Sequence, residues 1–177
     1  MKFSNGEKLI LVMLSDVYKK LGVEGEIDPE FVKKAIFRGH TWGLRWKYDG
    51  IFGGSKDDDP PAVNEVIKIL TMWRAIEGAY KRLPMEDQEK LKKDAGYFED
   101  DIGFYGFDGN DEAEHFSITT FLTKDLGLFD EFKDRNINSH IETLPRYRRM
   151  LSMYELSLEN LRNRSFNASE LLAILQC

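Results

Sequence analysis

The stretch DPPAVNEVIKILTMWRAIEGAYKRL, residues 59–83, decides the fold. Asp59 is expected to accept the first free backbone N–H groups of a helix, Pro60 suits its first position, and a proline directly after the stretch ends it. Apolar side chains cover most of the helix circumference and leave only a narrow polar stripe. Because such a helix must be covered on several sides, the stretch predicts a central helix at about 60–83 with Trp73 buried.

Capping signals predict further helices before this stretch. Ser4 and Glu7 form a capping box that opens a helix ending near residue 21. One face of this helix is apolar and carries Leu9, Ile10, Met13, Val17 and Leu21. An Asp-Pro pair then starts a second helix over about 28–38.

Similar signals follow the central helix. A short polar helix is expected over about 85–96. Asp108 is expected to cap a helix over about 109–126, and another begins near Thr143. Asn167 opens a last short helix through a second capping box.

These helices account for most of the chain, and no convincing run of strand-type alternation interrupts them. The predicted fold is therefore all-α, a single-domain multi-helix bundle over residues 1–177 around the central helix. A hydrophobic fraction of 42% and a charged fraction of 32% are typical of a soluble globular protein.

Charge and cysteine content narrow the choice of partners and compartment. There are 25 Lys and Arg residues against 31 Asp and Glu, a net charge of −6, so we expect no direct nucleic-acid binding. Cys177 is the only cysteine, which excludes an internal disulfide and suits a reducing compartment. No apolar run is long enough to span a membrane, and the start lacks a secretory signal. We therefore expect a cytoplasmic protein without membrane association.

The segment FRGHTWGLRWKYDGIF, residues 37–52, interleaves aromatic residues with glycines. It predicts a short helix with flexible joints, which either lines a ligand pocket or covers one end of the core. The run Asp57–Asp59 that follows also has two interpretations. It is either a metal site or, as we favour, a complement to the macrodipole of the central helix.

Signatures of common enzymes and metal sites are missing from the sequence. It contains no phosphate-binding GxxxxGK, no GxSxG, no HExxH and no pair of cysteines. Glu112 and His115 form one Glu-x-x-His pair, whereas a carboxylate-bridged di-metal site needs two. We therefore expect no metal and no cofactor.

One charged cluster points to a site. Arg146, Arg148 and Arg149 fall in the first turn of a predicted helix, where the macrodipole disfavours positive charge. A bound anion or a carboxylate of the protein must compensate the positive charge of these arginines. We predict that Arg149 forms a partly buried ion pair with Asp108 or Glu112. The alternative is that Arg149 is free to bind an anionic ligand.

The segments LILVMLSDVYK, FRGHTWGL, FYGFD with EA four residues on, and YRRML follow one another along the chain. Through these segments, which span nearly its whole length, the sequence resembles the YfbU family of uncharacterised bacterial proteins. The matching residues are Arg38, Gly39, Phe107, Asp108, Glu112, Ala113, Tyr147, Arg149, Met150 and Leu151. The resemblance implies an all-helical fold and brings no catalytic residue or activity with it.

Some relatives in this family carry a helix-turn-helix domain, which suggests ligand sensing; no such segment is visible here, and we expect no transcriptional role. Our leading hypothesis is a sensor or adaptor that binds a small ligand or a protein partner. One alternative is an enzyme of unknown reaction built on Arg149, Asp108, Glu112 and His115. Another is a structural homo-oligomer with an apolar aromatic contact surface. The candidate ligand-binding residues are Arg38, Trp42, Tyr105, Asp108, Glu112, Tyr147 and Arg149.

Overall fold

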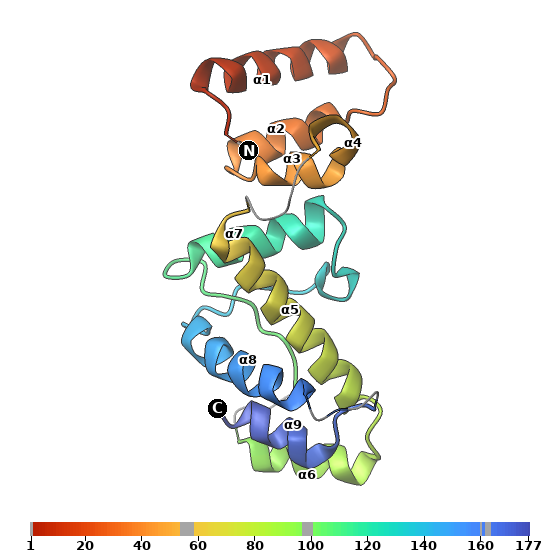
Figure 1. Cartoon of the computed structure of the whole chain (residues 1–177), viewed down its shortest axis with the longest axis vertical. Coiled ribbons are helices and arrows are strands. Elements are labelled where there is room, and N and C mark those ends of the chain that lie inside the picture. Colours follow the sequence, from red (N-terminus) through yellow and green to blue (C-terminus); the bar gives the residue numbers. More distant parts are fainter. Residues whose placement is uncertain (1, 54–58, 97–100, 160, 162–163) are drawn as a thin grey trace.

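The computed structural model describes residues 2–53, 59–96, 101–159, 161 and 164–177. Across these residues the regular structure is helical, so the all-α prediction is confirmed (Figure 1). The helices are α1 (Asn5–Lys20), α2 (Pro29–Phe37), α3 (Trp42–Lys47), α4 (Asp49–Phe52), α5 (Pro61–Tyr80), α6 (Met85–Ala95), α7 (Ala113–Thr120), α8 (Leu144–Leu158) and α9 (Ala168–Leu175). A π-helical turn, Phe121–Asp125, continues α7, and Asp130–Phe132 forms a 3₁₀ turn.

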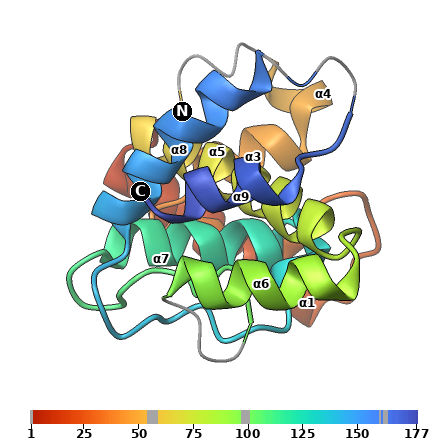
Figure 2. The same ribbon diagram turned by 90° about the horizontal axis from the view of Figure 1, so that it is seen from below.

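The helices are stacked along the long axis of the molecule. Figure 1 shows α1 as the outermost layer at one end, followed by α2, α3 and α4. Helix α5 runs obliquely through the rest and contacts α7, α8 and α9. Seen from below, α9 lies between α6 and α8 (Figure 2), and it contacts both of these helices. The position of α5 confirms the predicted central helix.

The core is built around aromatic rings on α5 and α8. Trp73 is fully buried, as predicted, and its ring lies edge-on to that of Tyr147, with 5.5 Å between centroids. Phe104 and Phe107, from the irregular segment before α7, pack against Tyr147 as well. Edge-to-face contacts of this kind stabilise a core beyond the apolar area that they bury.

A buried carboxylate on α5 holds two irregular segments in place. The two carboxylate oxygens of Glu77 accept hydrogen bonds from the two terminal nitrogens of Arg135, each at 2.7 Å. Glu77 also accepts the backbone N–H of Phe104 at 2.9 Å. Because its charge is fully partnered, burial of Glu77 against the core is tolerated, and the segments on either side of α7 are tied to the central helix.

The local capping predictions have mixed outcomes. The capping boxes of Ser4 with Glu7 and of Asn167 with Glu170 are confirmed, since both reciprocal hydrogen bonds are present in each. Asp59 does not cap α5, because Pro60 occupies the N-cap position and Asp59 binds a buried arginine instead. The rest of the acidic run, residues 57–58, lies outside the described residues.

The helix predicted over 109–126 is also shorter than expected. Asp108 accepts the backbone N–H of Asn110 at 2.8 Å in a local turn, and α7 starts only at Ala113. A short polar side chain that bonds two residues onward favours a turn over a helix start. At the other end the backbone widens into the π-helical turn, where the N–H of Leu126 reaches the carbonyl of Phe121 at 2.9 Å.

Candidate functional site

The predicted site residues fall into separate parts of the fold. Asp108, Glu112 and Tyr147 are buried close together, and the backbone N–H of Tyr105 donates to the Tyr147 hydroxyl at 3.4 Å. Burial raises the pKa of Tyr147 above its usual value. Arg38 and Trp42 belong to the layer of α2 and α3, and Arg149 lies on an exposed part of α8.

Glu112 has a structural task. Its carboxylate accepts the backbone N–H groups of Asp108 at 2.8 Å and of Thr143 at 2.9 Å, together with that of Leu144. The Thr143 hydroxyl donates a further bond of 3.1 Å to the same carboxylate. Glu112 thus satisfies the free amides at the start of α8 from a different segment of the chain. Its oxygens are already engaged, which leaves an acid–base role without support from the geometry.

The predicted ion pair between Arg149 and Asp108 or Glu112 is wrong. Arg149 donates to the carbonyl of Cys177 at 3.0 Å, and Arg146 donates to that of Leu175 at 2.9 Å. These carbonyls stand at the end of α9, where helix termini carry partial negative charge. The last turn of α9 therefore compensates Arg146, and a main-chain oxygen just beyond that helix accepts from Arg149.

The third arginine enters a small ionic cluster that joins three helices. Arg148 on α8 binds the carboxylate of Glu65 on α5 through two bonds of 2.7 and 3.0 Å. The Nε2 atom of His115 on α7 lies 2.8 Å from the same carboxylate. Arg148, followed by His115, holds the pKa of Glu65 at about 2. The predicted Glu-x-x-His pair is thus divided, because Glu112 and His115 have different partners.

Among the described residues, no three His, Cys, Asp or Glu side chains are grouped so that they could hold a metal ion. The described chain likewise contains no helix that is both long and apolar enough to cross a membrane.

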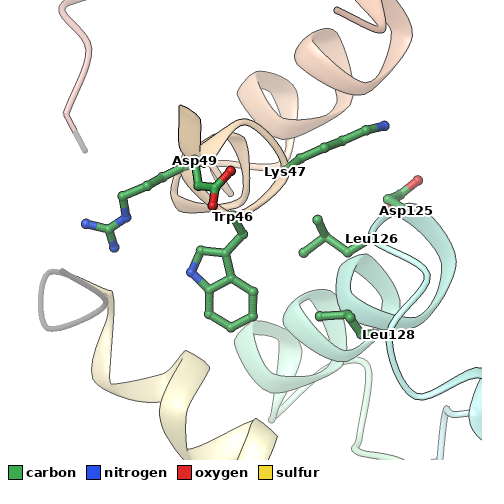
Figure 3. A pocket seen from close by; sticks show the side chains of 7 residues that line it. Trp46, Lys47, Asp49, Asp125, Leu126 and Leu128 are labelled. Atoms are coloured by element: carbon green, nitrogen blue, oxygen red, sulfur yellow. The ribbon is translucent and has the colours of Figure 1, made fainter. Parts of the chain in front are cut away.

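A cavity of about 530 Å³ lies between α3 and the π-helical turn (Figure 3). In Figure 3 the indole of Trp46 faces Leu126 and Leu128 across the hollow. Charged residues complete the lining, and the whole set is Arg45, Trp46, Lys47, Asp49, Asp125, Leu126 and Leu128. An apolar wall with a few charged groups at its edge is the usual composition of a small-molecule site.

A buried ion pair next to this cavity fixes the orientation of one of its walls. The guanidinium of Arg45 binds the carboxylate of Asp59, with side-chain exposures of 8% and 0%. The other oxygen of Asp59 accepts the indole N–H of Trp46 at 2.8 Å. Trp42 supports the indole from behind, at 5.1 Å between ring centroids. The orientation of Trp46 is therefore set by the same carboxylate that neutralises Arg45.

Another edge of the cavity is formed by charged side chains that already have partners within the protein. Asp125 is almost fully buried and binds Lys34 at 3.0 Å and Arg38 at 2.5 Å. The ammonium of Lys47 lies over the ring of Phe31 at 4.1 Å. Arg38 therefore contributes to the site through Asp125, at the end of the π-helical turn.

Close backbone packing makes this arrangement possible. A Cβ atom at Gly43 would lie 2.3 Å from Cε1 of Phe121, so a side chain there would force α3 away from the π-helical turn. Phe121 also packs against Trp42, at 5.4 Å between centroids.

A second cavity of about 400 Å³ adjoins the first. Trp46 and Leu128 line both, and the second also contacts Asn64, Ile67, Arg74 and Phe129. We call the two cavities together, with Trp46 and Leu128 between them, the Trp46 groove. Sequence reasoning had found its aromatic side in residues 37–52 but had missed the contribution of residues 125–129, which carry no recognisable motif.

Fold and groove together define an all-α protein with an aromatic-lined hollow between two helical layers. The chain belongs to the YfbU family, since the sequence profile of the YfbU domain matches residues 1–177. It is 31% identical over 155 residues to the UPF0304 protein MJECS11 of Methanocaldococcus jannaschii. That alignment covers 84% of this chain and 85% of the relative. The family resemblance seen in the sequence is thus confirmed.

Proposed function

We propose that this protein is a sensor or adaptor domain that binds a small molecule in the Trp46 groove. The observation that carries the proposal is the cavity of about 530 Å³ beside a half-buried indole. Small-molecule sites usually have volumes of about 300–1,000 Å³ and mostly apolar walls with a few polar groups. The aromatic segment then both supports the core, through Trp42, and lines the pocket, through Trp46.

The lining indicates the chemical class of the ligand. Trp46, Leu126 and Leu128 offer a flat apolar surface. Two opposite charges stand at its edge, Asp49 and Lys47, of which Lys47 also pairs with Asp28 at 3.4 Å. A small molecule with an aromatic or branched aliphatic part and a zwitterionic or dipolar head would match both features. We also propose a cytoplasmic location, because the Sγ of Cys177 is a free thiol that donates to the carbonyl of Ala173.

Native mass spectrometry of freshly purified protein, followed by a screen of small aromatic and aliphatic amino acids and related zwitterions, tests the proposal. Binding is read from thermal shift and from acrylamide quenching of tryptophan fluorescence. Trp42 and Trp73 are buried whereas Trp46 is half-buried, so quenching reports chiefly on the groove. A ligand in the groove should raise Tm and reduce quenching.

The matched variants are Leu128→Glu, in the groove, and Leu156→Glu, on α8. Both leucines are partly exposed, at 38% and 62%, so both variants should fold. We expect Leu128→Glu to weaken binding at least about tenfold, since one lost apolar contact plus a buried charge costs more than about 1.4 kcal/mol. Leu156→Glu should bind like the wild type. Equal binding to both variants, or no binding to the wild type by any of these compounds, would refute the proposal.

A further inference from the structure

Helix α1 turns its more apolar side towards solvent. Six side chains along this side are between 51% and 72% exposed, and they are Leu9, Ile10, Met13, Leu14, Val17 and Leu21. We call this set the α1 outer face. Its spacing of three and four residues forms one continuous stripe along the helix. An amphipathic helix normally buries such a stripe, and a monomer rarely exposes a contiguous apolar patch of this extent.

The inner side of α1 is less apolar and is held partly by polar contacts. Ser15 is the buried residue of the helix, and its hydroxyl donates to the carbonyl of Leu11 at 2.7 Å. Salt bridges join the helix to α2, from Lys19 to Glu30 at 2.8 Å and from Asp16 to Lys33 at 2.6 Å. The helix is therefore fixed on α2 with its apolar stripe outward. Among the described helices, α1 is the outermost at that end of the molecule (Figure 1).

We propose that the α1 outer face is the contact surface of a homodimer in which the α1 helices of two copies pack antiparallel. The charges at the two ends of α1 favour a second, antiparallel copy of the chain as the partner of this face. The first turn carries Glu7, and the last turn carries Lys19 and Lys20. Antiparallel packing keeps the two ends that carry Lys19 and Lys20 apart and places Glu7 of each copy, with Lys8 beside it, nearer to these lysines of the other. It also opposes the two helix dipoles. Parallel packing would bring like charges together.

The geometry also suits a twofold contact. A helix of 16 residues is about 24 Å long, and the stripe has the spacing with which helices interdigitate at shallow crossing angles. A twofold axis uses the same patch on both copies, so one exposed stripe is sufficient. Standard interfaces bury about 800 Å² on each partner, and a single helix pair lies at the low end of that range. We therefore expect a dimer that dissociates on dilution.

A lipid surface is the competing occupant. Helices that lie on membranes combine an apolar face with a polar face rich in Lys and Arg. The polar side of α1 instead carries Asp16 among its lysines, and the whole chain has a net charge of −6. These charges favour a second copy of the chain over an anionic bilayer.

Sedimentation velocity over a concentration series of about 1–200 µM tests the dimer, because affinities of weak two-helix contacts fall in that range. The wild type should shift from monomer to dimer. Leu14→Glu, in the middle of the stripe, should remain monomeric throughout, and Leu156→Glu on α8 should behave like the wild type. Leu14 is 56% exposed, so circular dichroism should show an unchanged helix content. A wild type that is monomeric at every concentration, or a Leu14→Glu variant that dimerises normally, would overturn the proposal.

Cysteine cross-linking in a Cys177→Ser background tests the antiparallel arrangement. Met13→Cys, near the middle of α1, should form a covalent dimer on mild oxidation, because the two copies meet across the axis. Leu21→Cys should not, since its two copies would lie about 24 Å apart along the helix axes, beyond the reach of a disulfide. Cross-linking through both positions would indicate parallel packing and contradict the arrangement. Flotation with phosphatidylcholine–phosphatidylglycerol vesicles, abolished by Leu14→Glu in a protein that stays monomeric, would assign the face to lipid instead.

Discussion

The carboxylate of Glu112 accepts the backbone N–H of Thr143 at 2.9 Å, so the residue that precedes α7 caps the start of α8. The same carboxylate receives three more hydrogen bonds, from Asp108, Leu144 and the Thr143 hydroxyl. It thereby joins the two helices that flank the irregular segment between them. This contact explains an acidic residue that is buried without a positively charged partner, because four donors share its charge.

Glu112→Gln should lower the free energy of unfolding by about 2–4 kcal/mol, since the amide has only one acceptor oxygen and leaves buried N–H groups without a partner. Glu114→Gln is the matched control, because Glu114 lies two residues further on, is exposed and should change stability by less than about 0.5 kcal/mol. Urea unfolding followed by circular dichroism measures both. Equal stabilities of the two variants would contradict the capping role.

Asp59→Asn removes the carboxylate that neutralises the buried guanidinium of Arg45. We expect a loss of about 3–5 kcal/mol, because one partner of a buried pair is left charged. The double variant with Arg45→Met should recover part of this loss, since no buried charge then remains. The exposed Asp49→Asn, on the edge of the same cavity, serves as the control. A full loss in the double variant as well would show that Asp59 acts through Trp46 alone.

Local signals predicted the helices because their causes are local. Ser4 with Glu7 and Asn167 with Glu170 meet within one helical turn, so their capping boxes could be recognised from spacing. Asp59 and Asp108 have the same residue type at equally plausible positions, yet neither caps a helix. Asp59 is taken by Arg45, a partner that only the packing of α3 brings near.

One wall of the candidate site could be predicted because its signal is local in the sequence, whereas the other wall could not. The mixture of rings and glycines in residues 37–52 indicated a pocket or a core cover, and Trp46 and Trp42 fill these two roles. The opposite wall, with Leu126 and Leu128, has no sequence signal because it depends on how closely Gly43 lets α3 approach Phe121. A ligand-binding role for Tyr105, Asp108, Tyr147 and Arg149 stays a prediction.

Gly106→Ala should be among the most damaging small substitutions in the chain. Gly106 has φ = +90°, and a Cβ atom there would lie 1.8 Å from the carbonyl oxygen of Ile137. Gly127 is the matched control, since it has φ = +66° and nothing within 4 Å of its Cβ position. Gly127→Ala should cost about 1–2 kcal/mol for backbone strain, whereas Gly106→Ala should cost several kcal/mol more. Thermal and urea unfolding would show the difference. Similar losses in the two variants would mean that the segments around Phe107 and Asn138 separate easily.

Glu65→Gln tests the ionic cluster through its pH dependence. The bonds from Arg148, and then from His115, lower the pKa of Glu65 from 4.5 to about 2 in the folded protein. A carboxyl whose folded pKa lies below its unfolded value stabilises the protein above the unfolded pKa, and this contribution is lost as pH falls towards the folded pKa. The wild type should therefore exceed Glu65→Gln in unfolding free energy at pH 6–7, by on the order of 2 kcal/mol. The difference should shrink below about pH 4.5 and vanish near pH 2. Glu155→Gln, which breaks a half-exposed pair with Lys68, should differ from the wild type by less than about 0.5 kcal/mol at each pH. A Glu65→Gln difference that stays constant from pH 7 to pH 2 would show that the side chain stabilises the junction of α5, α7 and α8 through its hydrogen bonds and not through its charge.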